Sequence, residues 1–477
     1  MKTRLIYLLK SPIFLLSFFF IFFIFRYGFL ISSNPWPSSD LPAQVLIIEQ
    51  YRTYWYKGLI SFYDPTTFTG WPVHFFYGFL PFFITAPISY LFDLFASDSV
   101  TLTINTMIVL VSSSLIFSLY FAAKPFFEEL LKSFDNEKLF DKADTLKAYF
   151  ILLLGLLCFW FLNSDHQDAS VGIGAPLFTG LYGQMFGWHA FLLYIGLMAR
   201  FINNNKKSYI PLIAISVCLL LFCHTLSAVF GFSIGALCFF WFQNKRIKIF
   251  KAHIIGIALS GMWLFPFLRY MSEYTINSPI NTSDFIEVIF RYPLFNLYKS
   301  IKSTILGDFV LINYTYLLVI ALVITAFVSR FVRKTRLLSA FLFFTILLIA
   351  LFTSGYIVRS VPISLHYYRF TGLIMLLALT LLSVVFLHWF NFIVKKKNEY
   401  FGLFGIIFVL LFGICFFFNI NIQHPYIFEI KRDRDIIKQQ FMELEKVYGY
   451  FKDENSQGRV FIEYLNDYEN FPPPISH

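Results

Sequence analysis

Long apolar runs separated by short basic segments fill most of this chain. A transmembrane helix needs about 20 mainly apolar residues, and fewer at the short end of the range. Eleven runs meet this requirement: 12–31, 101–123, 148–163, 186–203, 208–223, 226–243, 252–269, 311–329, 337–353, 368–390 and 401–420. The pattern predicts an all-α polytopic membrane protein with about eleven transmembrane helices over residues 1–420. The first run lacks a small-residue cleavage site, so it is interpreted as an uncleaved span.

Basic residues between the runs indicate the orientation, because Lys and Arg mark the cytoplasmic side of a membrane protein. They cluster at 2–10, 124–147, 200–207, 245–251, 330–336 and 395–397. These clusters fit one face if the N-terminus is inside and the C-terminus is outside. Two long loops, about 32–100 and 270–310, would then face outward. Residues 421–477 would form an outer tail, a helix plus a strand, that either docks on the membrane domain or begins an incomplete soluble domain.

A twelfth apolar run, Phe76 to Phe95, is ambiguous. Counting it as a crossing would put the N-terminal basic cluster on the opposite face from the others. It also contains Pro81 and Pro87, with Asp93 near its end. We therefore expect an outer-face juxtamembrane or re-entrant helix, with an ordinary span as the alternative.

Composition supports the membrane interpretation and narrows the partners. The chain is 58% hydrophobic and only 14% charged, whereas soluble domains carry about 25% charged residues. The net charge of +10 is distributed between the apolar runs rather than gathered in one patch, so no nucleic acid is expected as a partner. The five cysteines show no metal-ligand spacing and are expected to be small buried hydrophobes.

Acidic residues are few in the predicted outer loops, so each is a candidate for chemistry. Asp40 follows the first span and precedes a predicted helix over 41–56; it is either a catalytic carboxylate or the N-cap of that helix. Asp165, His166 and Asp168 lie in the turn after the third span. They could hold a divalent cation such as Mg²⁺ or Mn²⁺, or bind an acceptor, or form an ordinary solvated turn.

Cationic and aromatic residues complete the candidate set. Arg369, His366 and Arg291 could bind a lipid phosphate, although long cationic side chains also snorkel to headgroups. His224 lies on an outer hairpin, where it could line a groove or serve only packing. Gln184 and His189 could line the same groove. The remaining candidates for the groove are Trp71, His74 and Tyr77.

These features together resemble the GT-C superfamily of membrane glycosyltransferases. More narrowly, the chain is similar to the bacterial and archaeal membrane proteins catalogued as pyruvoyl-tetrahydropterin-synthase-related. The resemblance rests on Asp40-Leu41-Pro42, Gly70-Trp71-Pro72, Phe76 to Pro81, His224 to Ser227, Trp263 to Pro266 and His366 to Phe370. Many relatives carry a second acid beside the aspartate or a histidine four residues after it. Here those positions hold Leu41 and Gln44, which puts metal binding by this loop in doubt.

The resemblance implies a GT-C-like fold and an enzyme that moves a sugar from a polyprenyl-phosphate donor to an extracytoplasmic acceptor, with inversion. Asp40 would be the catalytic base, and Arg369, His366 and Arg291 would bind the phosphate. Asp165 and Asp168 would bind the acceptor or a cation. A bacterial inner membrane is the expected location, with the active site facing outward. The alternatives are a lipid-linked oligosaccharide flippase or transporter, and an oligosaccharide polymerase or ligase.

Overall fold

The computed structural model describes residues 11–33, 41–55, 57, 62–64, 71–73, 78–132, 143–163, 171–178, 181–274, 323–324, 327, 335–353 and 370–396. Within these ranges the chain is almost entirely helical, with one short hairpin. The elements are α2 (Pro12–Tyr27), η1 (Gly28–Leu30), α3 (Leu41–Trp55), β1 (Phe62–Asp64), β2 (Trp71–Val73), α4 (Leu80–Phe92), α5 (Ser99–Lys132), α6 (Ala143–Asn163), α7 (Gly174–Phe178), α8 (Tyr182–Asn204), α9 (Tyr209–Cys223), α10 (Thr225–Trp241), η4 (Gln243–Lys245), α11 (Arg246–Leu259), α12 (Gly261–Tyr274), α15 (Arg336–Thr353) and α17 (Thr371–Lys396).

The described residues form apolar helices of membrane-spanning length, as predicted for a helical membrane protein. Five described helices, or up to six if each bent pair counts as one span, are long and apolar enough to cross a bilayer. The five are α2 with η1, α5, α6, α8 and α17. Helices α9 and α15 are apolar but shorter, and α10 is followed by η4 and α11 at a bend of 108°. The predicted spans 311–329 and 401–420 lie mostly or wholly outside the described residues, so the total of eleven stays a prediction.

Two predicted spans differ from the observed helices. The run 252–269 is divided at Ser260, between α11 and α12. Ser260 and Gly261 form the kind of small-residue pair at which helices commonly kink. Helix α5 is longer than predicted, because it continues past Lys124 to Lys132 and carries Pro125 inside it.

Helix α4 occupies the ambiguous run Phe76–Phe95. Its 13 residues span about 20 Å at 1.5 Å per residue, whereas the hydrocarbon core of a bilayer is about 30 Å thick. One side of α4 packs on α3, α5, α8 and α9, with Phe82 and Ala86 fully buried. Its length and packing favour the interpretation of this run as a short helix rather than a crossing.

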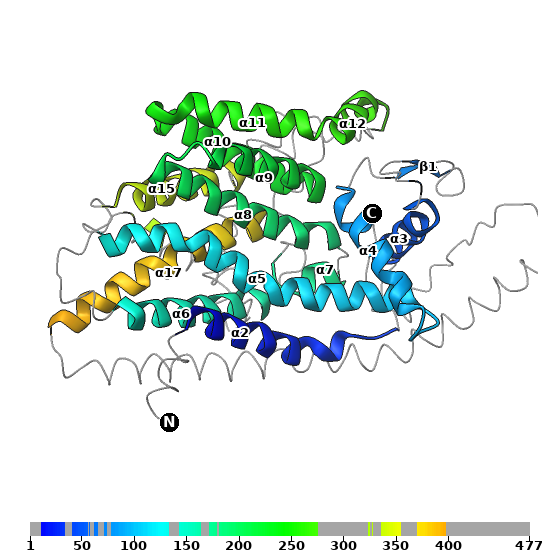
Figure 1. The fold of residues 1–477 in the computed structure, drawn as a ribbon, viewed down its shortest axis with the longest axis horizontal. Helices are drawn as coiled ribbons and strands as arrows, with labels where there is room; N and C mark the ends of the chain where they lie inside the picture. Colours follow the sequence, from blue (N-terminus) through cyan, green and yellow to red (C-terminus); the bar gives the residue numbers. More distant parts are fainter. Residues whose placement is uncertain are drawn as a thin grey trace, which may run out of the picture.

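The helices form a bundle in which most axes run along the long dimension (Figure 1). At one end, which we call the basic end, the C-terminus of α8 meets the start of α11: Lys248 Nζ donates a hydrogen bond to Asn205 Oδ1 over 3.1 Å. The guanidinium of Arg336, at the start of α15, lies 5.6 Å from the ring centre of Phe242. Helices α3 and α4 and the hairpin lie at the opposite end, the α4 end. Several predicted basic clusters therefore gather at one end.

Glu129 joins the last turn of α5 to the first turn of α15 at the basic end. Its Oε1 accepts a hydrogen bond from the backbone N–H of Leu337 over 2.8 Å, and its Oε2 accepts one from Leu338 over 3.1 Å. The first N–H groups of a helix have no acceptor within the helix, and negative charge is favourable beside them. Glu129 thus acts as a cap supplied by another helix.

Replacing Glu129 by Gln should destabilise the protein by about 1–2 kcal/mol, because the amide keeps one acceptor oxygen and loses the charge. The matched control is Glu128→Gln. Glu128 lies 3.8 Å from Lys124, and both side chains are about half exposed. Replacing Glu128 should therefore destabilise the protein by less than about 0.5 kcal/mol. Thermal unfolding of the purified protein in detergent measures both. Equal effects of the two variants would show that Glu129 does not cap α15.

Candidate functional site

Most of the sequence-predicted site residues lie outside the described residues. They are Asp40, His74, Tyr77, Asp165, His166, Asp168, Arg291, His366 and Arg369. Trp71 and His224 are described. Helices next to Asp40, the Asp165–Asp168 segment and Arg369 are described too, and they show where these three loops meet the bundle.

Trp71 begins strand β2, which pairs antiparallel with β1. In the register of this hairpin, Trp71 lies opposite Asp64 and Pro72 lies opposite Tyr63. Among the described residues the sheet has two strands, so each is an edge strand, where a proline is tolerated. The sequence predicted both segments as parts of the first loop but did not predict that they pair.

His224 separates α9 from α10 in an extended backbone conformation. Its N–H donates to the carbonyl of Leu220 over 3.1 Å, and its own carbonyl accepts from the N–H of Ala228 over 3.1 Å. Helix α9 therefore ends at His224, and α10 begins there. The start of α4 covers this turn: the rings of Phe79 and Phe222 lie 4.7 Å apart. The His224 side chain is therefore buried under the α4 end, as a groove wall or a packing residue would be.

Helix α3, which begins one residue after Asp40, is attached to α8 through α4. The ring of Tyr51 in α3 stacks on Phe82 in α4 at 6.5 Å, and Phe82 lies 6.0 Å from the ring of Tyr182 in α8. The hydroxyl of Tyr182 also hydrogen-bonds that of Thr85 over 2.6 Å. A chain of buried aromatic rings thus fixes α3 on the first turn of α8.

The segment carrying Asp165 and Asp168 follows α6, and the end of α6 packs on α8. Phe161, near the end of α6, meets Trp188 of α8 edge to face at 5.2 Å. The chain returns beside its starting point, because the N–H of Ile173 donates to the carbonyl of Leu162 over 3.0 Å. Helix α7 follows and packs against α3, α5 and α8.

The residue after Arg369 is anchored to α10. The ring of Phe370 lies 6.2 Å from Phe230, which in turn lies 5.3 Å from Phe191 of α8. The helices next to the Asp165–Asp168 segment and Arg369 therefore contact the N-terminal half of α8 directly or through α10. Helix α3, which follows Asp40, reaches it through α4, from Tyr51 near the far end of α3. Sequence reasoning placed these loops on one side of a membrane, but it did not identify α8 as their common support.

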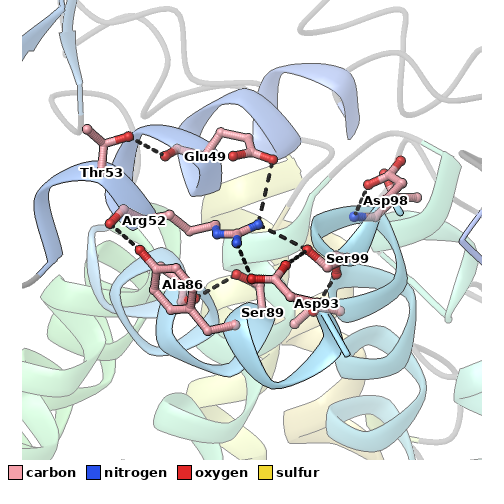
Figure 2. A network of polar contacts seen from close by, with 11 residues as sticks. Glu49, Arg52, Thr53, Ala86, Ser89, Asp93, Asp98 and Ser99 are labelled. Atoms are coloured by element: carbon pink, nitrogen blue, oxygen red, sulfur yellow. Dashed lines mark hydrogen bonds and ion pairs between the residues drawn. The ribbon is translucent and has the colours of Figure 1, made fainter. Parts of the chain in front are cut away.

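Sequence reasoning also missed an ion-pair network at the α4 end, centred on Arg52 (Figure 2). Its guanidinium donates to Asp93 over 2.6 Å and to Ser99 over 3.0 Å, and it lies 4.6 Å from the ring centre of Tyr90. Glu49 is 4.0 Å away. The Arg52 side chain is only 17% exposed. Arg52 thus ties α3 to the end of α4 and the start of α5, and it is a structural tether rather than a free cation.

The two carboxyl groups around Arg52 have opposite pKa shifts. The Ser99 hydroxyl, and then the Arg52 guanidinium, lower the pKa of Asp93. Partial burial raises the pKa of Glu49 despite the nearby Arg52. A lowered folded-state pKa means that Asp93 stabilises the fold fully above its unfolded pKa of about 3.9, and that this contribution is lost as the pH falls through the folded value.

Replacing Arg52 by Ala should therefore lower the melting temperature at neutral pH. The difference from the native protein should shrink as the pH falls below about 4, where protonated Asp93 no longer forms the ion pair. The measurement is thermal unfolding in detergent between about pH 7 and pH 3. Arg246→Ala, which removes an exposed arginine at the basic end, is the control. A pH-independent difference for Arg52→Ala would contradict the role of Asp93.

Histidines and acids within the described residues do not form a group of three that could hold a metal ion. The predicted cation ligands Asp165 and Asp168 lie outside the described residues.

His189, which the sequence predicted to line the same groove as His224, forms hydrogen bonds to α5. Its ring nitrogens hydrogen-bond Ser118 over 2.7 Å and the carbonyl of Val111 over 2.9 Å, so it joins α8 to α5.

Neither the family models, nor the curated proteins, nor the solved structures compared with this chain give a significant match. The resemblance to GT-C enzymes thus rests on the short motifs, and the function follows as a proposal from chemistry and geometry.

Proposed function

We propose that this protein is a membrane glycosyltransferase that moves a sugar from a polyprenyl-phosphate donor to an acceptor outside the cytoplasm. The observation that supports it most is that three helix ends next to candidate residues belong to helices packed on α8, directly for α6 and α17 and through α4 for α3. These ends carry a single carboxylate, a pair of carboxylates and an arginine, in the order Asp40, Asp165 with Asp168, and Arg369. Such a reaction needs a base, an acceptor site and a group that stabilises a departing phosphate.

In the proposed reaction, Asp40 takes the proton from the acceptor hydroxyl. The hydroxyl oxygen forms a bond to the anomeric carbon of the sugar, and the bond from that carbon to the phosphate oxygen breaks. The electron pair leaves with the polyprenyl phosphate. Arg369, with His366 and Arg291, would stabilise the charge of this phosphate, because guanidinium groups pair well with phosphate oxygens. A single displacement inverts the configuration at the sugar.

The short helix α4 supports a lipid-linked donor in this scheme. With 13 residues it is shorter than the helices that cross a bilayer. It packs on α3 and on the end of α9 before His224, and Leu91 near its end is exposed by 64%. Exposed apolar side chains of this kind are suited to lipid chains. Trp71, His74 and Tyr77 precede α4 and would flank the sugar, since aromatic rings offer apolar faces to sugar rings.

The test is the fate of the lipid-linked sugar in a strain that lacks this protein. A transferase predicts that the donor accumulates in the outer leaflet, where membrane-impermeant periodate oxidises its sugar. A flippase predicts accumulation in the inner leaflet, protected from periodate. For the purified protein with the accumulated donor, NMR of the product should show an inverted anomeric linkage. Retention would contradict the single displacement, and inner-leaflet accumulation would contradict transfer.

A further inference from the structure

Cationic side chains from two separate turns gather on the surface of the basic end. We call them the basic patch: Lys206 and Lys207 in the turn between α8 and α9, and Lys245, Arg246, Lys248 and Lys251 in η4 and the start of α11. Most of these side chains are exposed, and Lys245 and Lys248 are half-buried. No aspartate or glutamate occurs in the sequence between Asp168 and Glu273. The helices that carry the basic patch therefore bring no negative charge of their own.

Two hydrogen bonds hold the two turns together. Lys248 Nζ donates to Oδ1 of Asn205, the residue before Lys206, over 3.1 Å. Lys245 Nζ donates to the carbonyl oxygen of Ile202 in the last turn of α8. The two partners in each bond are 43 residues apart in the sequence. The basic patch is thus one continuous surface that exists only in the folded bundle.

The glutamates at the end of α5 do not neutralise the basic patch. Glu128 is the ion-pair partner of Lys124, and both carboxylate oxygens of Glu129 accept hydrogen bonds from the start of α15. Within the described residues, no ion pair involves a member of the basic patch. Lys248 and Arg336 also lie close enough to Lys245 to repel it. An anion from outside the protein would relieve this repulsion.

The start of α11 strengthens the preference for an anion. The first N–H groups of a helix carry partial positive charge, so basic side chains beside them are unfavourable. The N-cap of α11 is Lys245, and its first turn contains no acidic residue. The start of α15, at the same end of the bundle, receives the carboxylate of Glu129. No described residue supplies the equivalent negative charge to α11.

An exposed apolar strip of α11 continues from the basic patch. Ile247 and Phe250 are exposed by 64% and 56%. The strip extends along the helix through Ile254, Ile255 and Leu259, which are also exposed. The opposite side of α11 packs on α9, and α11 lies at the edge of the bundle (Figure 1). Cations at one end of an apolar strip match the charge pattern of an anionic phospholipid, which has a phosphate headgroup and acyl chains.

We infer that the basic patch and the adjoining strip of α11 bind an anionic phospholipid from the leaflet around the basic end. The phosphate group lies between the two turns, beside Lys206, Arg246 and Lys251. The acyl chains follow the strip from Ile247 toward Ile254. This inference concerns the end of the bundle opposite the predicted active site, and it does not depend on sugar transfer.

The experiment is native mass spectrometry of the full-length protein in a neutral detergent, with added phosphatidylglycerol or phosphatidylcholine. The native protein should bind its first phosphatidylglycerol at least about fivefold more tightly than phosphatidylcholine. Arg246→Gln combined with Lys251→Gln should weaken phosphatidylglycerol binding by about fivefold or more, because each cation near an anionic headgroup contributes about that factor. Binding of phosphatidylcholine should not change.

The matched control combines Lys124→Gln with Arg269→Gln, which removes the same charge outside the basic patch and should leave the lipid preference unchanged. Lys206→Gln combined with Lys207→Gln alters the patch from its other turn and should weaken phosphatidylglycerol binding too, so the test does not depend on the folding of one variant. Native affinity in both patch variants would overturn the inference. So would equal binding of the two lipids by the native protein, or an equal loss in the control. Neither lipid is a sugar donor, so a failed transfer assay leaves this result unaffected.

Discussion

Replacing Asp40 by Asn is expected to lower sugar transfer about 10²–10⁴-fold, the usual contribution of a general base. The substitution separates the two interpretations of this residue. Asparagine caps helices about as well as aspartate does, so α3 should keep its start and its packing. The amide cannot accept the proton of the acceptor hydroxyl, so the catalytic interpretation predicts a large loss. Product formation from the accumulated lipid-linked donor, measured with equal amounts of protein, checks this.

Asp98 offers a control for this experiment. Its Oδ1 accepts a hydrogen bond from the backbone N–H of Thr101 over 2.9 Å at the start of α5, which is the role that the capping interpretation gives to Asp40. Asp98→Asn should keep both stability and transfer. If Asp40→Asn behaves like Asp98→Asn, Asp40 is a cap, and the base must be sought elsewhere.

Replacing Gly78 by Ala is expected to destabilise the protein by about 3 kcal/mol or more, a large effect for one methyl group. An added Cβ would lie 2.2 Å from the carbonyl oxygen of Phe222 and 2.6 Å from that of Cys223. Both neighbours are backbone atoms at the end of α9, so no side chain can move aside to relieve the overlap. The start of α4 would have to withdraw from the His224 turn.

Gly28→Ala is the matched control for Gly78→Ala, because an added Cβ there meets nothing within 4 Å. Thermal unfolding in detergent, with the folded fraction measured by size-exclusion chromatography, compares the two. Gly78→Ala should also lower transfer, since it moves α4 relative to α8. Equal stability of the two variants would show that α4 is not pressed against the end of α9.

The spans were the most predictable part of the fold. A long apolar run in lipid must satisfy its own backbone hydrogen bonds, and the helix is the solution available to a single segment. Helices α6, α8 and α17 therefore occur close to the predicted bounds. For the run Phe76–Phe95, the prolines and the charges on either side predicted a helix that does not cross. The structure shows a helix of 13 residues there, and its place relative to the membrane stays a prediction.

The features that sequence reasoning missed depend on contacts between distant segments. Arg52 and Asp93 are ordinary charged residues until α3 and α4 pack together, and nothing local marks Glu129 as the cap of a helix more than 200 residues later. The break at Ser260 interrupts an apolar run whose hydropathy is continuous. For the site, His224 could be placed on its turn, but its burial beside the start of α4 depends on the contact between Phe79 and Phe222, which are far apart in the sequence.

The central place of α8 has a consequence for biogenesis. Helices leave the ribosome in chain order, so α8 enters the membrane long before α17 is synthesised. Helix α17 packs against α5, α6 and α8, and until it arrives those surfaces remain covered by lipid or by the insertion machinery. The packing around α8 is thus among the last parts of the described bundle to be completed. A nascent chain therefore cannot reach the packing described for α5, α6 and α8 until α17 has been inserted.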